Sequence, residues 1–149
     1  MDSYLQLLED GAAFYIATRD AENHPDVAVL TGAAAGREPG TLTVYMVEGW
    51  TQTLANLRDN GRVAVTLARL VDYRTFQLKG HALGVRAARE DERPAILRQH
   101  DAFARSADFE ELGHVVRSWA SWPCVAIEIR VEEVFAQTPG PGAGQRVGS

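Results

Sequence analysis

Hydroxyl side chains cluster where a predicted strand gives way to a predicted helix, in the segment Gly49–Thr53 (GWTQT). The start of a helix carries free backbone N–H groups and the positive end of the helix dipole, and both favour a bound anion. Thr51 and Thr53 add two hydroxyl donors beside Gln52, so the segment predicts a phosphate cradle for a cofactor. The alternative interpretation is that Thr51 only caps the helix.

A second group of donors lies along one predicted strand, Tyr73–Gly80 (YRTFQLKG). Arg74 has the charge to pair with a phosphate, and a hydroxyl or amide such as Thr75 or Gln77 can bond to the edge of a heterocycle. The alternative interpretation is an ordinary solvated strand face. Tyr45 and Tyr73 are further candidate hydroxyl groups of a pocket.

Aromatic side chains offer a different kind of contact with a flat ligand. Trp50, Trp119 and Trp122 can stack on a ring, although tryptophans also serve packing and dimer contacts. The sequence therefore leaves both uses open.

Motifs for metal or hydrolytic chemistry are missing from the sequence. The four histidines lack ligand spacing with one another or with a cysteine or carboxylate, so no metal site is predicted. No serine stands in a G-x-S-x-G turn, and no paired catalytic carboxylates are indicated. The sequence assigns no catalytic residue.

Composition places the chain among ordinary globular proteins. Its 149 residues are 46% hydrophobic and 23% charged, which predicts one domain with a sizeable core. The net charge of −5 argues against a general nucleic-acid binder, which needs a clustered basic face. No apolar run approaches the ~20 residues of a membrane span, and the first ten residues are acidic and polar rather than leader-like. With Cys124 as a lone, core-type cysteine, the sequence predicts a cytoplasmic protein.

The elements that must position these groups follow from hydrophobic periodicity. Alternating residues predict six strands, over residues 13–19, 27–31, 42–47, 63–68, 74–86 and 125–132. Helices are predicted over 3–9, 51–60 and 90–104, with another starting near residue 106. Gly80 separates two sets of apolar residues of opposite parity, which predicts a β-bulge. Residues 32–40 are predicted to form a Gly-rich loop.

This pattern has no βαβ alternation, so a doubly wound dinucleotide fold is not predicted. The sequence favours a mainly β (α+β) antiparallel domain over residues 1–137. Residues 138–149 form a Pro/Gly-rich C-terminal tail, which predicts no regular element and is either disordered or laid over a partner.

Four segments carry a family resemblance: Phe14–Asp20 with His24-Pro25, Leu42–Val47, Leu54–Val65 and Arg74–Gly80. In this order they resemble the pyridoxamine 5'-phosphate oxidase-like, FMN-binding split-barrel family. The resemblance implies a six-stranded antiparallel split barrel with short decorating helices. It also implies a homodimer with FMN in a groove at the subunit interface.

The resemblance assigns roles to the candidate residues. It places the FMN phosphate near Thr51, Gln52, Thr53 and Arg74. The flavin ring would contact the strand that holds Tyr45 and the position of Thr75.

The chain departs from the family at the positions where tight FMN binders carry Lys or Arg. It has Gln52 and Thr53 at the start of the helix, and Asp26 and Thr31 on the second strand. Each charge-assisted bond contributes roughly 1.5–3 kcal/mol, so the loss of two cations is expected to weaken FMN binding by roughly a hundredfold or more.

The function implied is an FMN-dependent oxidoreductase that acts on a small-molecule substrate. The alternative is a non-catalytic binding protein for haem, a deazaflavin or another ligand, with His81 or His114 as a candidate axial ligand. A third possibility is a structural dimer without a cofactor.

Overall fold

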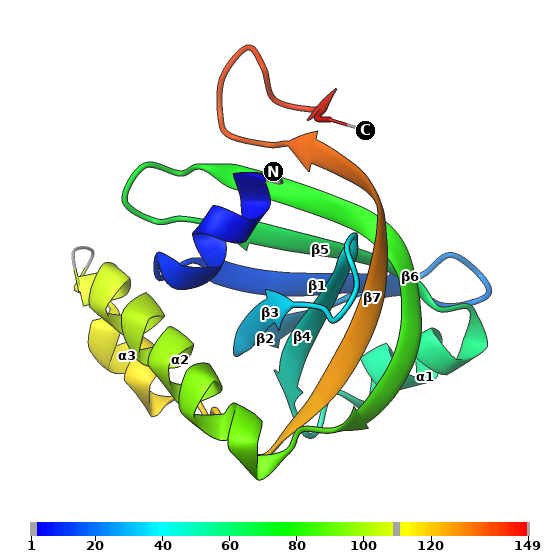
Figure 1. Cartoon of the computed structure of the whole chain (residues 1–149), viewed down its shortest axis with the longest axis horizontal. Helices are drawn as coiled ribbons and strands as arrows, with labels where there is room; N and C mark the ends of the chain where they lie inside the picture. Colours follow the sequence, from blue (N-terminus) through cyan, green and yellow to red (C-terminus); the bar gives the residue numbers. More distant parts are fainter. Residues whose placement is uncertain (1–2, 109–110, 149) are drawn as a thin grey trace.

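The computed structural model describes residues 3–108 and 111–148 and shows a curled antiparallel sheet that forms a split barrel (Figure 1). The main path of the sheet runs β2-β1-β5-β6-β7-β4-β3, and β8 pairs with β7. The strands are β1 (Ala13–Arg19), β2 (Pro25–Leu30), β3 (Gly32–Ala35), β4 (Thr41–Val47), β5 (Arg62–Ala68), β6 (Thr75–Ala87), β7 (Cys124–Ala136) and β8 (Gln145–Arg146). The helices are η1 (Ser3–Glu9), α1 (Thr51–Asp59), η2 (Glu90–Glu92), α2 (Arg93–Asp108) and α3 (Gly113–Ser118).

The barrel interior is built by the alternating strands that the sequence predicts. On β5 the side chains of Val63, Val65 and Leu67 are buried, whereas Ala64 and Thr66 are only partly buried. This period of two places every second residue in the core. The prediction of a mainly β antiparallel barrel with short helices is confirmed.

Gly80 is the point where β6 bends. The register between β6 and β7 shifts between Lys79 and Gly80, as the predicted bulge requires, and again between Ala82 and Gly84. In Figure 1 the two long strands β6 and β7 sweep together around one side of the barrel. The second irregularity was not predicted.

The prediction of six strands is wrong by two. The Gly-rich segment expected to be a loop contains β3, which pairs with β4 through Gly32↔Tyr45 to Ala35↔Leu42. The C-terminal tail contains β8, whose Gln145 and Arg146 pair with the end of β7. β3 (GAAA) consists of small residues, and β8 has only two, polar residues, so both lack the alternating apolar residues that reveal a strand in sequence.

The helical predictions need two corrections. The residue that precedes the first turn of α1 is Trp50, and no side chain caps this helix, so the prediction of Thr51 as a cap is wrong. The last helix does not start near residue 106, because α2 continues to Asp108 and α3 begins at Gly113. Pro94 does lie in the first turn of α2, where its missing N–H costs nothing.

A second, smaller core lies between the sheet and α2. It contains Tyr45 on β4, Cys124 and Ala126 on β7, and Ile96 on α2. Cys124 is therefore a core residue, as predicted. Ala126 lies on the face of β7 opposite Ile127 and Ile129, and α2 covers part of that face through Ile96.

Gln99 on α2 ties this helix to the edge strand β3. Its Oε1 accepts the Ala33 N–H at 2.9 Å, and its Nε2 donates to the Ala33 carbonyl at 2.6 Å. The side-chain amide thus pairs with the edge as a neighbouring strand would.

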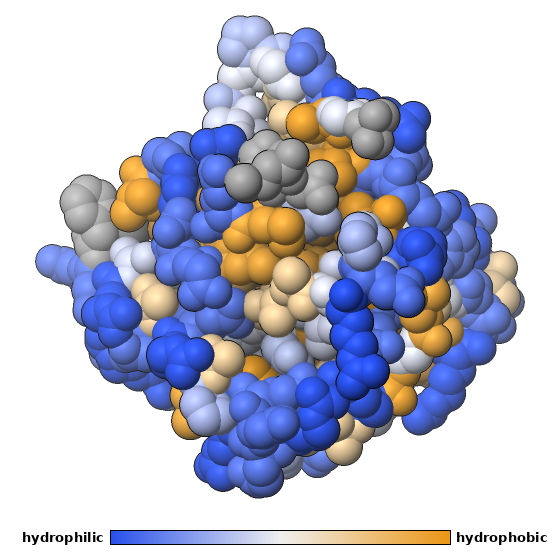
Figure 2. All heavy atoms as spheres, viewed as in Figure 1, coloured by the Kyte–Doolittle hydropathy of each residue, from blue (hydrophilic) through white to orange (hydrophobic). Residues whose placement is uncertain are grey.

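The surface on the side shown in Figure 2 is mostly hydrophilic, including the part over α2, and apolar atoms gather toward its middle. Within the described residues, no helix is long and apolar enough to cross a membrane.

Candidate functional site

In the predicted phosphate site at the start of α1, one of the three side chains is buried and already hydrogen-bonded, and the other two are exposed. Thr53 is fully buried, and its hydroxyl donates to Asp26 Oδ2 on β2 at 3.0 Å. Gln52 is exposed and donates from Nε2 to Asn56 Oδ1 at 2.8 Å. Thr51 is exposed at the first position of the helix.

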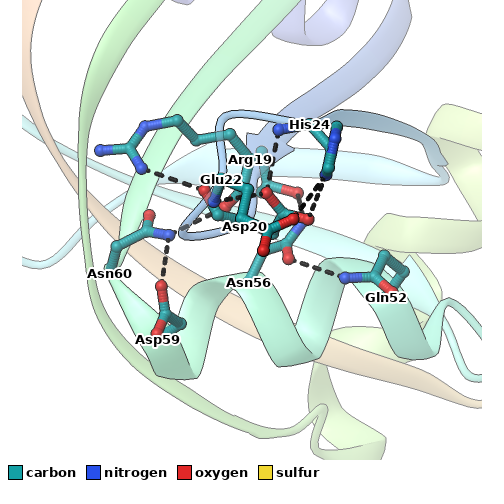
Figure 3. Close-up of polar contacts among 9 residues, drawn as sticks. Arg19, Asp20, Glu22, His24, Gln52, Asn56, Asp59 and Asn60 are labelled. Carbon is teal, nitrogen blue, oxygen red and sulfur yellow. Dashed lines mark hydrogen bonds and ion pairs between the residues drawn. The ribbon is translucent and has the colours of Figure 1, made fainter.

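Polar side chains hold α1 against the β1–β2 turn (Figure 3). The buried Asn56 donates to the Thr18 hydroxyl at 3.0 Å, and Asn60 donates to the Arg19 carbonyl at 2.8 Å. Because these groups satisfy one another, the barrel-facing side of α1 is a fixed structural contact.

The same turn brings together three possible metal ligands, Asp20, Glu22 and His24, which the sequence analysis did not group. Asp20 Oδ1 accepts the backbone N–H groups of Glu22 and His24, and its Oδ2 lies 2.9 Å from His24 Nδ1. The backbone hydrogen bond from His24 is the largest cause of the lowered pKa of Asp20. These bonds account for the grouping as a stabilised turn.

Arg74 and Thr75 lie at the start of β6. The Thr75 hydroxyl donates to the Tyr73 carbonyl at 2.8 Å, and the Arg74 guanidinium stacks 5.5 Å from the centre of the Phe76 ring. In the sheet register, Thr75 is opposite Ala68, and Ala68 is opposite Ala13.

This register places Arg74 and Thr75 away from the C-terminal half of α1 within one chain. Ala13 begins β1, whereas α1 contacts β1 at Thr18 and beside Arg19. Five residues of strand span roughly 17 Å. Arg74 therefore lies away from the contacts that Asn56 and Asn60 make with β1.

Tyr45 lies in a third place, a polar cleft between the sheet and α2. Its hydroxyl donates to Glu92 Oε2 at 2.6 Å, and Arg86 donates to both Glu92 oxygens, at 2.6 and 3.0 Å. The Arg89 backbone N–H gives Glu92 a fourth donor. The Arg86 hydrogen bonds are the largest cause that lowers the pKa of Glu92, to about 2, and desolvation is the largest cause that raises the pKa of Tyr45.

A mainly apolar pocket of about 400 Å³ lies between the barrel and the helical pair α2–α3. One wall comes from β1, β2 and the segment between β4 and α1, and the other from α2 and the end of α3. The lining residues are Ala12, Phe14, Val29, Leu30, Thr31, Val47, Trp50, His100, Phe103, Trp119 and Ala120. Phe103 and Trp119 form an aromatic pair with ring centres 6.2 Å apart.

His100 is the titratable side chain of this pocket. It is half-buried on α2, and desolvation lowers its pKa, opposed by a hydrogen bond with the Val116 backbone. Burial of the ring therefore favours the neutral form of the imidazole.

The two histidines proposed as axial ligands lie elsewhere. His81 is paired with Glu132 and lies 3.0 Å from Arg62 Nη1, and His114 is exposed on α3. Neither lines the apolar pocket.

The sequence indicates only part of this pocket. Trp50 and Trp119 were predicted as possible stacking residues, and both line the cavity. Phe103, His100 and the β2 residue Val29 also line it and were not predicted. Polar donors in the sequence do not reveal such a lining, because the lining consists mainly of apolar residues typical of a core. The packing of α2 and α3 on the barrel brings these residues together.

Comparison with protein-family models finds no match, and comparison with curated proteins finds none. Solved structures do resemble the chain. HupZ of Group A Streptococcus is 17% identical, with 97% of this chain and 99% of that chain covered and a TM-score of 0.57. An F420 reductase is also 17% identical, with 90% and 97% covered and a TM-score of 0.55.

A Clostridium acetobutylicum protein related to general stress protein 26, of the pyridoxine phosphate oxidase family, is 8% identical. The match covers 97% of this chain and 92% of the Clostridium protein's chain, with a TM-score of 0.56. The chain thus has the split-barrel fold of the pyridoxamine 5'-phosphate oxidase-like proteins. At these identities the likeness establishes the fold alone.

The residues present fit the ring of FMN but not its phosphate. A flat heteroaromatic ring suits the apolar pocket and its aromatic walls. Among the described residues, those that line the pocket include no Lys or Arg. At the start of α1, the Thr53 hydroxyl already has an acceptor, and that acceptor is the Asp26 carboxylate.

Proposed function

We propose that this protein binds the ring system of a flavin-type cofactor in the apolar pocket and works as an oxidoreductase on a small substrate. The single observation that carries the proposal is the pocket itself. Trp50, Trp119 and Phe103 line a cavity of about 400 Å³ together with aliphatic side chains. The F420 reductase with this fold supports a redox role.

The chain's own contribution is binding, orientation and exclusion of water. Aromatic walls stack on a flat ring, and burial in the pocket removes its faces from solvent. A bound flavin ring supplies the redox chemistry.

Replacing Trp50 by alanine is expected to weaken riboflavin binding about tenfold, because it removes an aromatic contact that contributes roughly 0.5–1.5 kcal/mol beyond buried area. Titration followed by flavin absorbance and fluorescence measures the dissociation constant. Trp122→Ala is the matched control, because Trp122 lies outside the pocket lining and packs against Arg93. If wild-type protein takes up no flavin at tens of micromolar, the proposal is wrong.

A second candidate function, haem binding, is favoured by His100. A metal-ligating histidine commonly uses its second ring nitrogen to bond a backbone carbonyl, and the hydrogen bond of His100 to the Val116 backbone is of this kind. The neutral imidazole is the form that binds iron.

A haem titration distinguishes this candidate from the first. Haem coordination by His100 predicts a Soret band that shifts or disappears in His100→Ala, while His114→Ala, on the exposed face of α3, behaves as wild type. An unchanged spectrum in His100→Ala excludes His100 as the ligand.

We also propose that the protein is a homodimer, because in one chain β5 separates β6, which begins at Thr75, from β1 and β2, against which α1 packs. A second copy can supply the missing group. Sedimentation equilibrium reports the mass, and a monomer at all concentrations would exclude this arrangement.

A further inference from the structure

The described residues that line the apolar pocket include no Lys or Arg to balance a negative charge. Its titratable residue is the half-buried His100, whose burial favours the neutral imidazole, and its polar side chains otherwise include the Thr31 hydroxyl. Burying an anion without a partner is costly, since the ion loses its hydration and gains no counter-charge.

The Asp26 carboxylate lies close to the pocket in sequence on β2, and its hydrogen-bond partner lies close to the pocket in sequence on α1. Asp26 lies on β2 three residues before Val29, and its hydrogen-bond partner Thr53 lies on α1 three residues after Trp50. The Asp26–Thr53 bond of 3.0 Å therefore joins β2 to α1 beside the pocket.

The Asp26 carboxylate lies at the start of α1, where a phosphate would otherwise bind. The positive end of the helix dipole and its free N–H groups favour an anion there. Asp26 already provides one, and a second anion close to it meets like-charge repulsion.

We propose that the pocket selects flat ring ligands that carry no phosphate, and that Asp26 is the residue that discriminates against phosphorylated ones. Among flavins, the protein then prefers riboflavin to FMN. The inference rests on the proposed flavin-type function and names its ligand class.

The test compares riboflavin with FMN on the full chain at low ionic strength. Flavin fluorescence in each titration gives the dissociation constant. We expect riboflavin to bind roughly tenfold more tightly than FMN, the ratio that Coulomb repulsion predicts for charges several ångströms apart near a surface. Added salt should narrow the difference, because it screens exposed charges.

Asp26→Asn isolates the charge. The asparagine side-chain oxygen can still accept the Thr53 hydrogen bond, so the contact between β2 and α1 is retained. We expect this variant to bind FMN about tenfold more tightly than wild type does and riboflavin equally well. Asp59→Asn, the same change at the far end of α1, should alter neither constant. Thermal unfolding of both variants checks that they fold.

Each outcome separates the inference from the proposed function. If FMN binds as tightly as riboflavin or more tightly, the selectivity is absent while flavin binding stands. If riboflavin is preferred but Asp26→Asn leaves the ratio unchanged, the role of Asp26 is wrong. If neither flavin binds, the proposed function fails, and this inference fails with it.

Discussion

Replacing Gly80 by alanine is expected to lower the free energy of unfolding by roughly 3 kcal/mol. Overpacking typically destabilises a protein by about 1–3 kcal/mol, and the loss is at the upper end where the added atom meets rigid backbone. A Cβ at Gly80 would overlap the carbonyl oxygen of Arg130 on β7. That atom belongs to the β6–β7 pairing and cannot move without opening the bulge. Urea unfolding of the variant measures the loss.

Gly84→Ala is the matched control for this substitution. Gly84 lies four residues further along β6, at the second register shift, and a Cβ there meets no atom within 4 Å. We expect this variant to unfold within about 0.5 kcal/mol of wild type. Equal losses for the two variants would show that strand propensity, rather than the close approach at Gly80, sets the cost.

Replacing Glu92 by glutamine is expected to cost about 3 kcal/mol of stability at pH 7. The folded protein holds the pKa of Glu92 at about 2, against an ordinary value of 4.5, mainly through the Arg86 hydrogen bonds. One pKa unit corresponds to about 1.4 kcal/mol. The carboxylate side chain is only 11% exposed, so solvent screens the interaction little.

The pH dependence has a defined sign. A carboxyl group whose pKa is lowered by folding stabilises the protein above its unfolded pKa. This contribution is complete above about pH 4.5 and disappears as the pH falls to about 2. The difference in unfolding free energy between wild type and Glu92→Gln should therefore shrink over that range.

Asp91→Asn serves as the control for Glu92, since Asp91 is a neighbouring, largely exposed acid paired with Arg89. It should leave stability within about 0.5 kcal/mol of wild type at every pH. A pH-independent difference between Glu92→Gln and wild type would mean that the Arg86 pair does not lower the pKa of Glu92.

The sequence by itself predicted most of the barrel. Residues such as Val63, Val65 and Leu67 alternate with small or polar neighbours, and this period of two identifies a strand and its buried face without knowledge of its partners. Gly80 marked the bulge, since a residue without Cβ at a change of parity allows the strand to bend. Strands β3 and β8 were not predicted, because β3 consists of small residues and β8 has only two polar residues, and neither shows such a period.

The candidate site was decided by tertiary structure. Thr53 is a hydroxyl at the start of a helix in the sequence, but packing of α1 on β2 buries it against Asp26. Thr75 begins β6, which β5 separates from the strands β1 and β2 that contact α1. The pocket that replaces the predicted cradle joins Val29, Trp50, Phe103 and Trp119 from distant parts of the chain. Local periodicity fixes which face of an element is buried, whereas contacts between distant elements depend on how all of them pack at once.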